Sequence, residues 1–329
     1  MAKVWRFKKL GGPDVLRMDD VSLPDLNEQD VHIQVKAIGL NRSDLNFRMN
    51  QYIQKPVFPS RFGSEASGII LEVGSNVEGF RAGDEVFIIP PDNLSTQGTA
   101  ADELVLHEKF IVKKPPSISF EEASAVWMQY LTAWGGVIHC ASPKKGDFVL
   151  ITAGSSSVGI AAMQLIKQIG AIPILTTLGR EKKKALLMEG AEFVIATDCE
   201  DLSLSLSAIT GKDGLAAAFD AVGGPQVLII ADALKKYGRL VIHGMLSEED
   251  THFPVKTAIR KSLSFHGYLF SEIINNPILK NQAIEHILSG ITNGELIPKI
   301  DKLFSFEQMR EAQEYMSTNH HIGKVVIKI

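Results

Sequence analysis

Residues 148–167, FVLITAGSSSVGIAAMQLIK, restrict the possible folds of this chain more than any other segment. An apolar run of strand length leads into a turn of small residues, and a helical pattern follows directly. Gly154, Ser156 and Gly159 occupy the three positions of a G-x-G-x-x-G fingerprint, with serine in the middle. Free N–H groups at such a helix start, including those of Ser157 and Val158, can hold a pyrophosphate. We therefore predict a dinucleotide-binding β-α-β unit. The alternative is a plain strand-to-helix turn.

The two halves of the sequence differ in their pattern of apolar and polar residues. Residues 1 to about 115 contain short alternating strands separated by turns, as in residues 31–37 (VHIQVKA), and predict a barrel-like β domain. From about residue 120, apolar strands alternate with long helical patterns, which is typical of the parallel sheet of an α/β protein, covered on both faces. The expected strands of that sheet are residues 148–153, 172–177, 193–195, 217–220 and 240–243.

The C-terminal strand indicates that the second domain is an insertion. Residues 324–329 (KVVIKI) alternate in the manner of the first half. We therefore expect the β domain to comprise residues 1–120 and 266–329. Residues 121–265 then form an inserted, doubly wound dinucleotide domain.

The end of the second strand of the inserted domain bears on the choice of nucleotide. An NAD site places an acidic residue there for the ribose 2′-OH, whereas this chain has TTLGREKKK in residues 176–184. Arg180 and Lys182, following Thr177, are placed to pair with a 2′-phosphate, so the sequence favours NADPH. The alternative is that these cations are only the solvated start of a helix.

Composition excludes several classes of protein. The 34 Lys and Arg against 38 Asp and Glu give a net charge of -4 without a basic block, so we expect no nucleic-acid partner. No uncharged apolar run approaches the roughly 18 residues of a membrane span, and we expect no membrane partner. Cys140 and Cys199, the only cysteines, give no disulfide framework and are expected to be buried small residues. A cytoplasmic protein fits these features.

Nine separated segments, taken together, resemble one family. They are residues 11–16 (GGPDVL), 37–44 (AIGLNRSD), 63–68 (GSEASG), 83–86 (GDEV), 131–134 (LTAW), the glycine-rich turn, 219–224 (FDAVGG), 238–244 (GRLVIHG) and 323–327 (GKVVI). In this order they resemble the medium-chain dehydrogenase/reductase superfamily, within it the zinc-free quinone oxidoreductase and enoyl reductase branch. The resemblance implies a GroES-like catalytic domain, an inserted Rossmann domain, a small-molecule substrate and a homodimer.

The resemblance also allows the metal positions of zinc alcohol dehydrogenases to be read in this chain. Asn41, Ser64 and about Met128 stand at the ligand positions of the catalytic zinc. None of the three is a usual zinc ligand, and two cysteines cannot supply a four-cysteine structural site. We therefore expect a metal-free protein.

Site residues follow from the same resemblance. Tyr52 is the expected hydrogen-bond donor to substrate, Asn41 is expected to bond near the nicotinamide or substrate, and Asp44 to brace its loop. For Tyr52 the alternative is a residue of the site wall, and for His243 a structural histidine. The predicted catalytic residues are Tyr52 and Asn41, and the predicted cofactor-binding residues are Asn41, Thr132, Gly154, Ser156, Ser157, Val158, Gly159, Thr177, Arg180, Lys182, Gly223, His243, Gly244 and Met245.

The function expected from these features is an NADPH-dependent, zinc-independent oxidoreductase. It would reduce quinones or activated C=C bonds of enones, enals or enoyl thioesters by hydride transfer. The resemblance does not choose among these substrates. Two alternatives remain: an alcohol dehydrogenase of the same fold, and a non-catalytic NADPH-binding sensor or scaffold protein.

Overall fold

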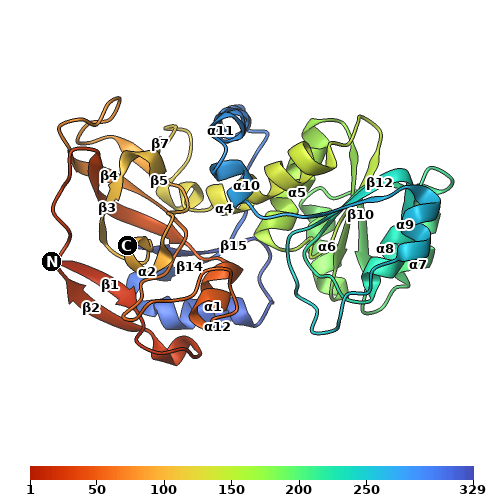
Figure 1. Cartoon of the computed structure of the whole chain (residues 1–329), viewed down its shortest axis with the longest axis horizontal. Helices are drawn as coiled ribbons and strands as arrows, with labels where there is room; N and C mark the ends of the chain where they lie inside the picture. Colours follow the sequence, from red (N-terminus) through yellow and green to blue (C-terminus); the bar gives the residue numbers. More distant parts are fainter. The chain divides into compact units, whose positions relative to one another are not determined.

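The computed structural model describes all 329 residues and divides the chain into two units (Figure 1). Unit 1 comprises residues 1–128 and 298–329, and unit 2 comprises residues 129–297. The sequence analysis placed the domain boundaries after residues 120 and 265. Residues 266–297 lie in unit 2 because their helices pack there, where His286 accepts the indole N–H of Trp134 (2.9 Å) and contacts Gln168 (2.9 Å).

Unit 1 is built on a largely antiparallel sheet of seven strands. Its longest strand, β3, alternates buried and half-buried residues, which is why the sequence shows period-two alternation there. The strands are β3 (Asp30–Gly39), β4 (Glu65–Val73), β5 (Glu85–Ile88), β6 (Glu103–His107), β7 (Ile111–Lys113), β14 (Ile300–Ser305) and β15 (Lys324–Lys328), with β1 (Ala2–Arg6) and β2 (Arg17–Val21) forming a separate pair. β15 pairs antiparallel with β3, so the predicted return of the C-terminus to the first domain is confirmed.

Unit 1 also contains short helices, of which α3 (Phe120–Ala123) and α12 (Met309–Ser317) pack against the sheet. The short helices are η1 (Pro13–Val15), α1 (Arg42–Arg48), α2 (Leu94–Gln97), η2 (Glu108–Phe110), α3 (Phe120–Ala123), η4 (Phe306–Gln308) and α12 (Met309–Ser317). α4 (Trp127–Ala133) begins in unit 1 and continues into unit 2. The N-terminus of α3 carries a capping box in which Ser119 and Glu122 exchange hydrogen bonds, as the sequence pattern S-x-x-E favours.

Unit 2 contains a parallel sheet in the order β10-β9-β8-β11-β12-β13. Its strands are β8 (Phe148–Ile151), β9 (Ile172–Thr177), β10 (Phe193–Ala196), β11 (Leu215–Asp220), β12 (Leu234–Ile242) and β13 (Ser264–Gly267). In chain order this is 3-2-1-4-5-6, the Rossmann order, which reverses direction between β8 and β11. Ligands of such sheets bind outside the carboxyl ends of the strands at the reversal.

Eight helical segments belong to unit 2. They are the π-helical η3 (Trp134–Ala141), α5 (Ser157–Gln168), α6 (Arg180–Met188), α7 (Leu202–Thr210), α8 (Gln226–Ala233), α9 (Val255–Lys261), α10 (Ser271–Ile274) and α11 (Pro277–Thr292). The five strands expected from the sequence are all present. β11 begins two residues earlier than expected, at Leu215, before an irregularity in its pairing. β12 begins at Leu234, and its start was missed because exposed polar residues break the apolar pattern there.

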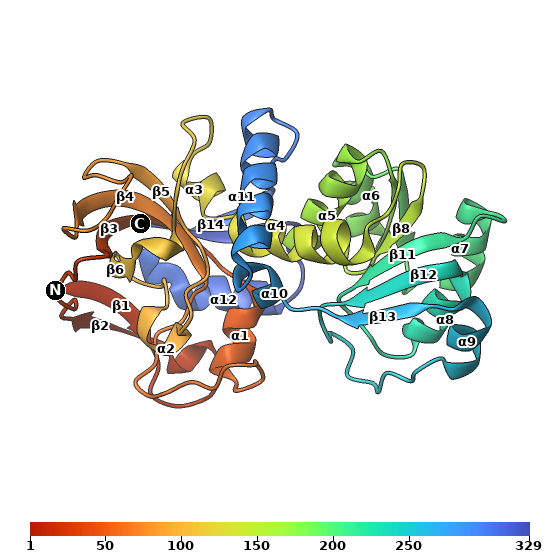
Figure 2. The ribbon, with the colours of Figure 1, turned by 45° about the horizontal axis from the view of Figure 1, so that its top comes forward.

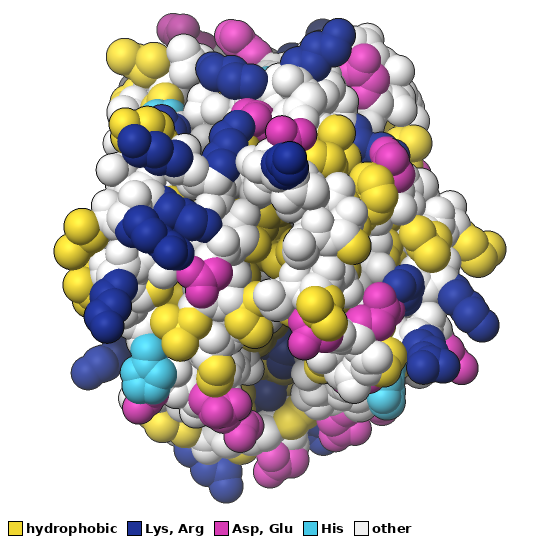
Figure 3. All heavy atoms as spheres, turned by 90° about the vertical axis from the view of Figure 1, so that its right-hand side faces the viewer, with side chains coloured by type: hydrophobic (Ala, Val, Ile, Leu, Met, Phe, Trp, Pro, Cys, Tyr) yellow, Lys and Arg dark blue, Asp and Glu magenta, His cyan; other side chains and the backbone are white.

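The core of unit 2 lies between the sheet and these helices. It joins strand residues such as Leu150 and Ile174 to helix residues such as Leu206 and Ile230. β13 lies at the edge of the sheet beside β12 (Figure 2). No helix in the structure is both long and apolar enough to cross a membrane. On the face shown in Figure 3, Lys and Arg side chains form several groups separated by acidic, apolar and neutral ones.

Candidate active site

The glycine-rich turn of unit 2 joins β8 to α5 in very close packing. A Cβ at Gly154 would lie 2.7 Å from Leu175 Cβ on the neighbouring strand β9, and a Cβ at Gly159 would lie 2.7 Å from Gly154 Cα. Both distances are far shorter than a van der Waals contact, so a side chain at either position would force the turn apart. The two outer glycines of the fingerprint therefore permit the close approach of helix and strand.

Ser156, which replaces the middle glycine, is the N-cap of α5. Its Oγ accepts the backbone N–H of Gly159 at 3.0 Å, so the side chain turns towards the helix. The N–H groups of Ser157 and Val158 belong to the first helical turn and have no intrahelical acceptor. These two donors, together with the positive end of α5, are the groups available to an anion such as a pyrophosphate.

Lys182 is brought next to this turn by α6. Its Nζ lies 3.3 Å from Ser155 Oγ, although the two residues are 27 positions apart. Thr177 is buried at the end of β9, and Arg180 is exposed at the first residue of α6. The structure therefore brings one of the two predicted cations to the glycine-rich turn and leaves the other at the adjoining surface.

An acidic residue that the sequence analysis missed lies beside Arg180. Asp198 follows β10 and accepts the N–H of Gly179 at 2.8 Å. This hydrogen bond and the charge of Arg180 lower the pKa of Asp198. The end of β9 carries no acid of its own, but the neighbouring strand supplies one. The only signal in the sequence is an aspartate two residues after the end of β10, and β10 is not the strand on which an NAD site places its acid.

A second missed residue, Asp220, organises the loop where the strand order reverses. The buried carboxylate of Asp220 accepts Thr152 Oγ1 at 2.6 Å and the N–H groups of Val222 and Gly223 at 3.0 Å each. Gly223, a predicted cofactor residue, has φ of +69°, a left-handed conformation that favours glycine. Thr152 and Asp220 thus link the ends of β8 and β11, the two strands that flank the expected ligand position.

The segment after β12 carries three predicted cofactor residues. The imidazole of His243 stacks on Phe219 with ring centroids 3.9 Å apart, and burial lowers the pKa of His243 to about 3. The ring is therefore neutral at physiological pH, and it does not act as a proton donor there. A Cβ at Gly244 would lie 2.6 Å from the carbonyl oxygen of Ala221, and Met245 is exposed. Thr132 lies in α4, half-buried.

Asn41, one of the two predicted catalytic residues, lies in a largely buried polar network of unit 1. Glu65 and Lys324, each 1% exposed at the side chain, form an ion pair. Lys324 Nζ also donates to Asn41 Oδ1 at 2.6 Å, and Asn41 Nδ2 donates to Glu65 Oε1 at 3.1 Å and to the carbonyl of Gly39 at 3.2 Å. Both amide hydrogens of Asn41 are therefore engaged within the chain. What it retains for a ligand is acceptor capacity on Oδ1.

Asp44 braces this network from α1. Its Oδ2 accepts the N–H of Asn41 at 2.8 Å, and Ser64 Oγ donates to its Oδ1 at 3.3 Å. Complete burial raises the pKa of Asp44 to about 7. Tyr52, in the loop after α1, is half-buried, and its burial together with the nearby Asp44 carboxyl raises its pKa to about 12. Tyr52 is therefore a protonated phenol at neutral pH, able to donate a hydrogen bond but not to release its proton easily.

The family's zinc positions can now be tested against the side chains present. Asn41 and Ser64 offer an amide and a hydroxyl, and Met128 contributes its backbone N–H to Glu65 Oε2 at 3.0 Å. The Glu65 carboxylate is bound to the ammonium group of Lys324, and the Asp44 carboxyl accepts from Asn41 and Ser64. A divalent cation here would have no thiolate or imidazole ligand and would face a fixed positive charge. These residues do not fit a zinc ion.

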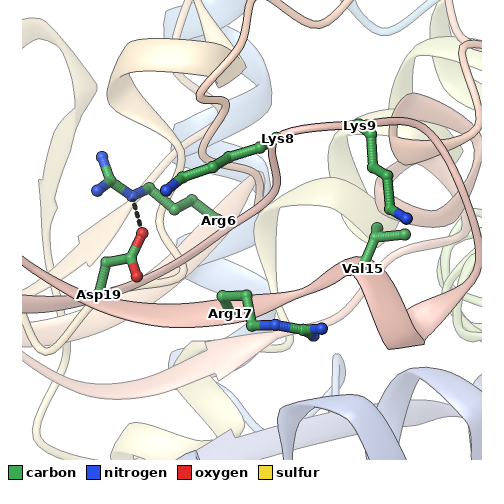
Figure 4. Close-up of a pocket in the computed structure, with 6 residues that line it drawn as sticks. All are labelled: Arg6, Lys8, Lys9, Val15, Arg17 and Asp19. Carbon is green, nitrogen blue, oxygen red and sulfur yellow. Dashed lines mark hydrogen bonds and ion pairs between the residues drawn. The ribbon is translucent and has the colours of Figure 1, made fainter.

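A pocket on unit 1 with a volume of about 350 Å³ lies outside this network. Its lining residues are Arg6, Lys8, Lys9, Val15, Arg17 and Asp19 (Figure 4). Arg6 Nε contacts Asp19 Oδ2 at 2.5 Å, and Arg17 Nη1 donates to the carbonyl of Leu16 at 2.8 Å. No predicted site residue lines this pocket.

Two family models match the chain. An "Alcohol dehydrogenase GroES-like domain" matches residues 27–116, and a "Zinc-binding dehydrogenase" domain matches residues 157–288. The first lies within unit 1 and the second within unit 2, in the order that the resemblance implied. The chain belongs to the medium-chain dehydrogenase/reductase superfamily, in its quinone oxidoreductase-like branch. The predicted fold class, a GroES-like domain with an inserted Rossmann domain, is confirmed.

Individual relatives agree with this placement. The chain is 28% identical to human quinone oxidoreductase over 311 residues, covering 94% of this chain and 92% of the relative. A solved structure of Escherichia coli quinone oxidoreductase complexed with NADPH matches with a TM-score of 0.90 and 27% identity over the full length of both chains. A structure described as an NAD-dependent alcohol dehydrogenase matches at 28% identity, a TM-score of 0.89 and full coverage of both. The chain is thus an oxidoreductase of this superfamily, whose fold serves more than one substrate and cofactor.

Proposed function

We propose that the protein is an NADPH-dependent, zinc-independent reductase of quinones or activated C=C bonds, such as those of enones, enals and enoyl thioesters. The observation that carries the proposal is the Lys324 ammonium group held between Asn41 and Glu65, where zinc-dependent members of the superfamily hold their metal ligands. A fixed protein cation and amide are present instead of a Lewis acid. The chemistry must then come from the cofactor and from hydrogen-bond donors.

Unit 2 holds the cofactor in this proposal. The N–H groups of Ser157 and Val158 receive the pyrophosphate, and Gly154 and Gly159 let the turn and α5 pack closely enough to place these donors beside the end of β8. Lys182, beside the turn, and Arg180 pair with the 2′-phosphate. The relative of 27% identity that was solved with NADPH supports this assignment. When bound, the nicotinamide supplies the hydride.

Unit 1 stabilises the substrate. Addition of hydride to a quinone or an enone leaves negative charge on the carbonyl oxygen, which a positioned donor stabilises. Tyr52 is that donor, since its phenol stays protonated with a pKa of about 12. Asn41 acts as an acceptor and as part of the wall, because its two amide hydrogens are already bound to Glu65 and Gly39.

Steady-state turnover of quinones, enones and simple alcohols, with NADPH and with NADH, tests the proposal. We expect reduction of at least one quinone or enone with NADPH, and no oxidation of alcohols that depends on added zinc. Tyr52→Phe is expected to lower kcat about tenfold or more with little change in KM, because the lost donor acts on charge that develops during the reaction. Zinc-dependent alcohol oxidation would contradict the proposal in favour of an alcohol dehydrogenase. Tight NADPH binding without turnover of any compound would favour a sensor or scaffold.

A further inference from the structure

We propose that unit 2 carries a binding site for a zinc-type divalent transition metal, formed by Cys140, His266 and Glu272, separate from the residues assigned to the reaction. The thiol, one imidazole nitrogen and one carboxylate oxygen of these residues all lie within 4.8 Å of one another. Their positions in the sequence span 132 residues, so only the fold brings them together.

The spacing of the three ligand atoms is close to that of a tetrahedral site. His266 Nε2 lies 3.1 Å from Glu272 Oε2. A tetrahedral zinc ion with bonds of about 2.0–2.3 Å keeps its ligand atoms roughly 3.3–3.8 Å apart. The imidazole and the carboxylate, joined by a hydrogen bond that a metal ion would replace, already have nearly this separation. The thiol of half-buried Cys140 lies within 4.8 Å of both, and a shift of about 1 Å by rotation of the exposed His266 and Glu272 side chains brings all three to it. A water molecule would complete the coordination, as in other three-ligand sites.

The backbone around the three residues is held firmly. Cys140 lies in η3, His266 in β13 and Glu272 in α10. Gly135 of η3 approaches the neighbouring segment so closely that a Cβ there would lie 2.0 Å from Tyr268 Oη and 2.6 Å from Ile273 Cγ1. Tyr268, two residues after His266, also donates its hydroxyl to the carbonyl of Leu131 at 3.1 Å. These contacts fix the three elements relative to one another, so the site needs little ordering on binding.

The charged groups near the cluster are one cation and one carboxylate. Arg239 donates to the carbonyl of Cys140 at 3.0 Å, so its guanidinium is held at the backbone of η3. The carboxylate of Glu272 contacts the imidazole of His266, so these two groups already lie together on one side of the cluster. Because cysteine binds metal ions as the thiolate, metal binding at Cys140 would release the thiol proton.

The kind of metal follows from the ligands and their exposure. One sulfur, one nitrogen and one oxygen ligand suit zinc, cobalt or nickel, whereas magnesium and calcium prefer oxygen ligands alone. His266 and Glu272 side chains are 46% and 41% exposed, so an ion can enter directly from solvent. Binding would cross-link η3, β13 and α10 and stabilise the folded unit.

Cobalt titration of the chelator-treated full-length protein tests the proposal, because cobalt bound to a thiolate gives a ligand-to-metal charge-transfer band in the near ultraviolet. We expect one equivalent of Co²⁺ to produce this band, Zn²⁺ to remove it by competition, and Zn²⁺ to raise Tm. Cys140→Ser abolishes the band and the rise in Tm. His266→Gln and Glu272→Gln weaken binding at least tenfold. Cys199→Ser, at the exposed second cysteine, is the matched control and behaves as wild type.

Alkylation provides a second readout that does not depend on the variants folding well. In the wild-type protein, we expect Zn²⁺ to protect Cys140 from iodoacetamide and to leave the labelling of Cys199 unchanged, as judged by peptide mass spectrometry. The absence of a charge-transfer band at millimolar Co²⁺ would overturn the proposal. A band that persists in Cys140→Ser, or equal labelling of Cys140 with and without zinc, would do the same.

Discussion

At the scale of the residue, the buried ion pair of Glu65 and Lys324 is expected to have a large effect on the free energy of unfolding. Removing one partner of such a pair leaves an uncompensated charge, which costs about 3–5 kcal/mol. We therefore expect Lys324→Met to lower the free energy of unfolding by this amount in urea titration. Lys328→Met, which breaks the exposed pair with Glu121, is expected to cost less than about 1 kcal/mol. In a double-mutant cycle, Glu65→Gln and Lys324→Met together should cost less than the sum of the two. Equal losses from Lys324→Met and Lys328→Met would contradict this role.

Asp44 gives the same region a dependence on pH. Its folded-state pKa of about 7 lies above the ordinary value of 3.8, so the folded chain retains a proton that the unfolded chain loses. The stability contributed by this proton is complete below about pH 4 and is lost as the pH rises to about 7. We expect Asp44→Asn, which cannot ionise, to remove this part of the decline. Comparing the free energies of unfolding of both proteins at pH 4 and 7 measures it. Parallel curves for the two proteins would show that Asp44 does not titrate in this range.

At the scale of the element, the predicted preference for NADPH over NADH depends on the first turn of α6. Arg180 and Lys182 each contribute about 1.5 kcal/mol if they bind a 2′-phosphate, which corresponds to about tenfold in affinity per contact. Replacing both by alanine is expected to reduce the ratio of kcat/KM for NADPH to that for NADH by about tenfold or more. Lys184→Ala, an exposed cation of the same helix, is the control and leaves the ratio unchanged.

The acidic residue beside Arg180 indicates which result would contradict the assignment of these cations to a 2′-phosphate. Asp198 lies near Arg180 and could serve a ribose hydroxyl instead of the cations serving a phosphate. A preference of the wild-type protein for NADH would support that arrangement. If the ratio of kcat/KM for NADPH to that for NADH is unchanged in the double variant, then Arg180 and Lys182 only form the solvated start of the helix.

At the scale of the whole molecule, we expect the reaction to need no metal. The Cys140→Ser variant lacks the metal site proposed above. Any dependence of its activity on zinc would therefore come from an ion at the reaction site. We expect this variant to contain no stoichiometric zinc by elemental analysis and to keep its turnover in chelator, because no ligand set for zinc exists around Asn41. Loss of activity in chelator with recovery on addition of Zn²⁺ would disprove this prediction.

We also expect two copies of the molecule to associate. β13 lies at the edge of the parallel sheet, and a free edge of this kind is normally covered or paired. Pairing of two such edges about a two-fold axis gives a closed dimer. Light scattering at micromolar concentration is expected to give twice the mass of the chain. A mass equal to that of one chain would contradict the prediction.

Local sequence patterns predicted much of this architecture. They could not predict contacts between segments that are far apart in the sequence. β9 has the predicted bounds, Ile172 and Thr177, because all of its residues after the first are buried in the parallel sheet. The ion pair of Lys324 with Glu65 joins residues 259 positions apart, and no local pattern records such a contact. Cys199 was expected to be buried and is exposed, since it follows β10 in a turn. That expectation rested on residue type alone.

The division of unit 1 into two stretches of sequence has a consequence for synthesis on the ribosome. Residues 129–297 are made and can fold while the final strand is still missing. Until residues 324–328 emerge, β3 lacks its neighbour β15, and Glu65 lacks its cation. The nascent first 128 residues therefore expose an open sheet edge and a carboxylate without its ion-pair partner for the whole time that the insertion is translated. We expect this interval to be the one in which the chain most needs a chaperone.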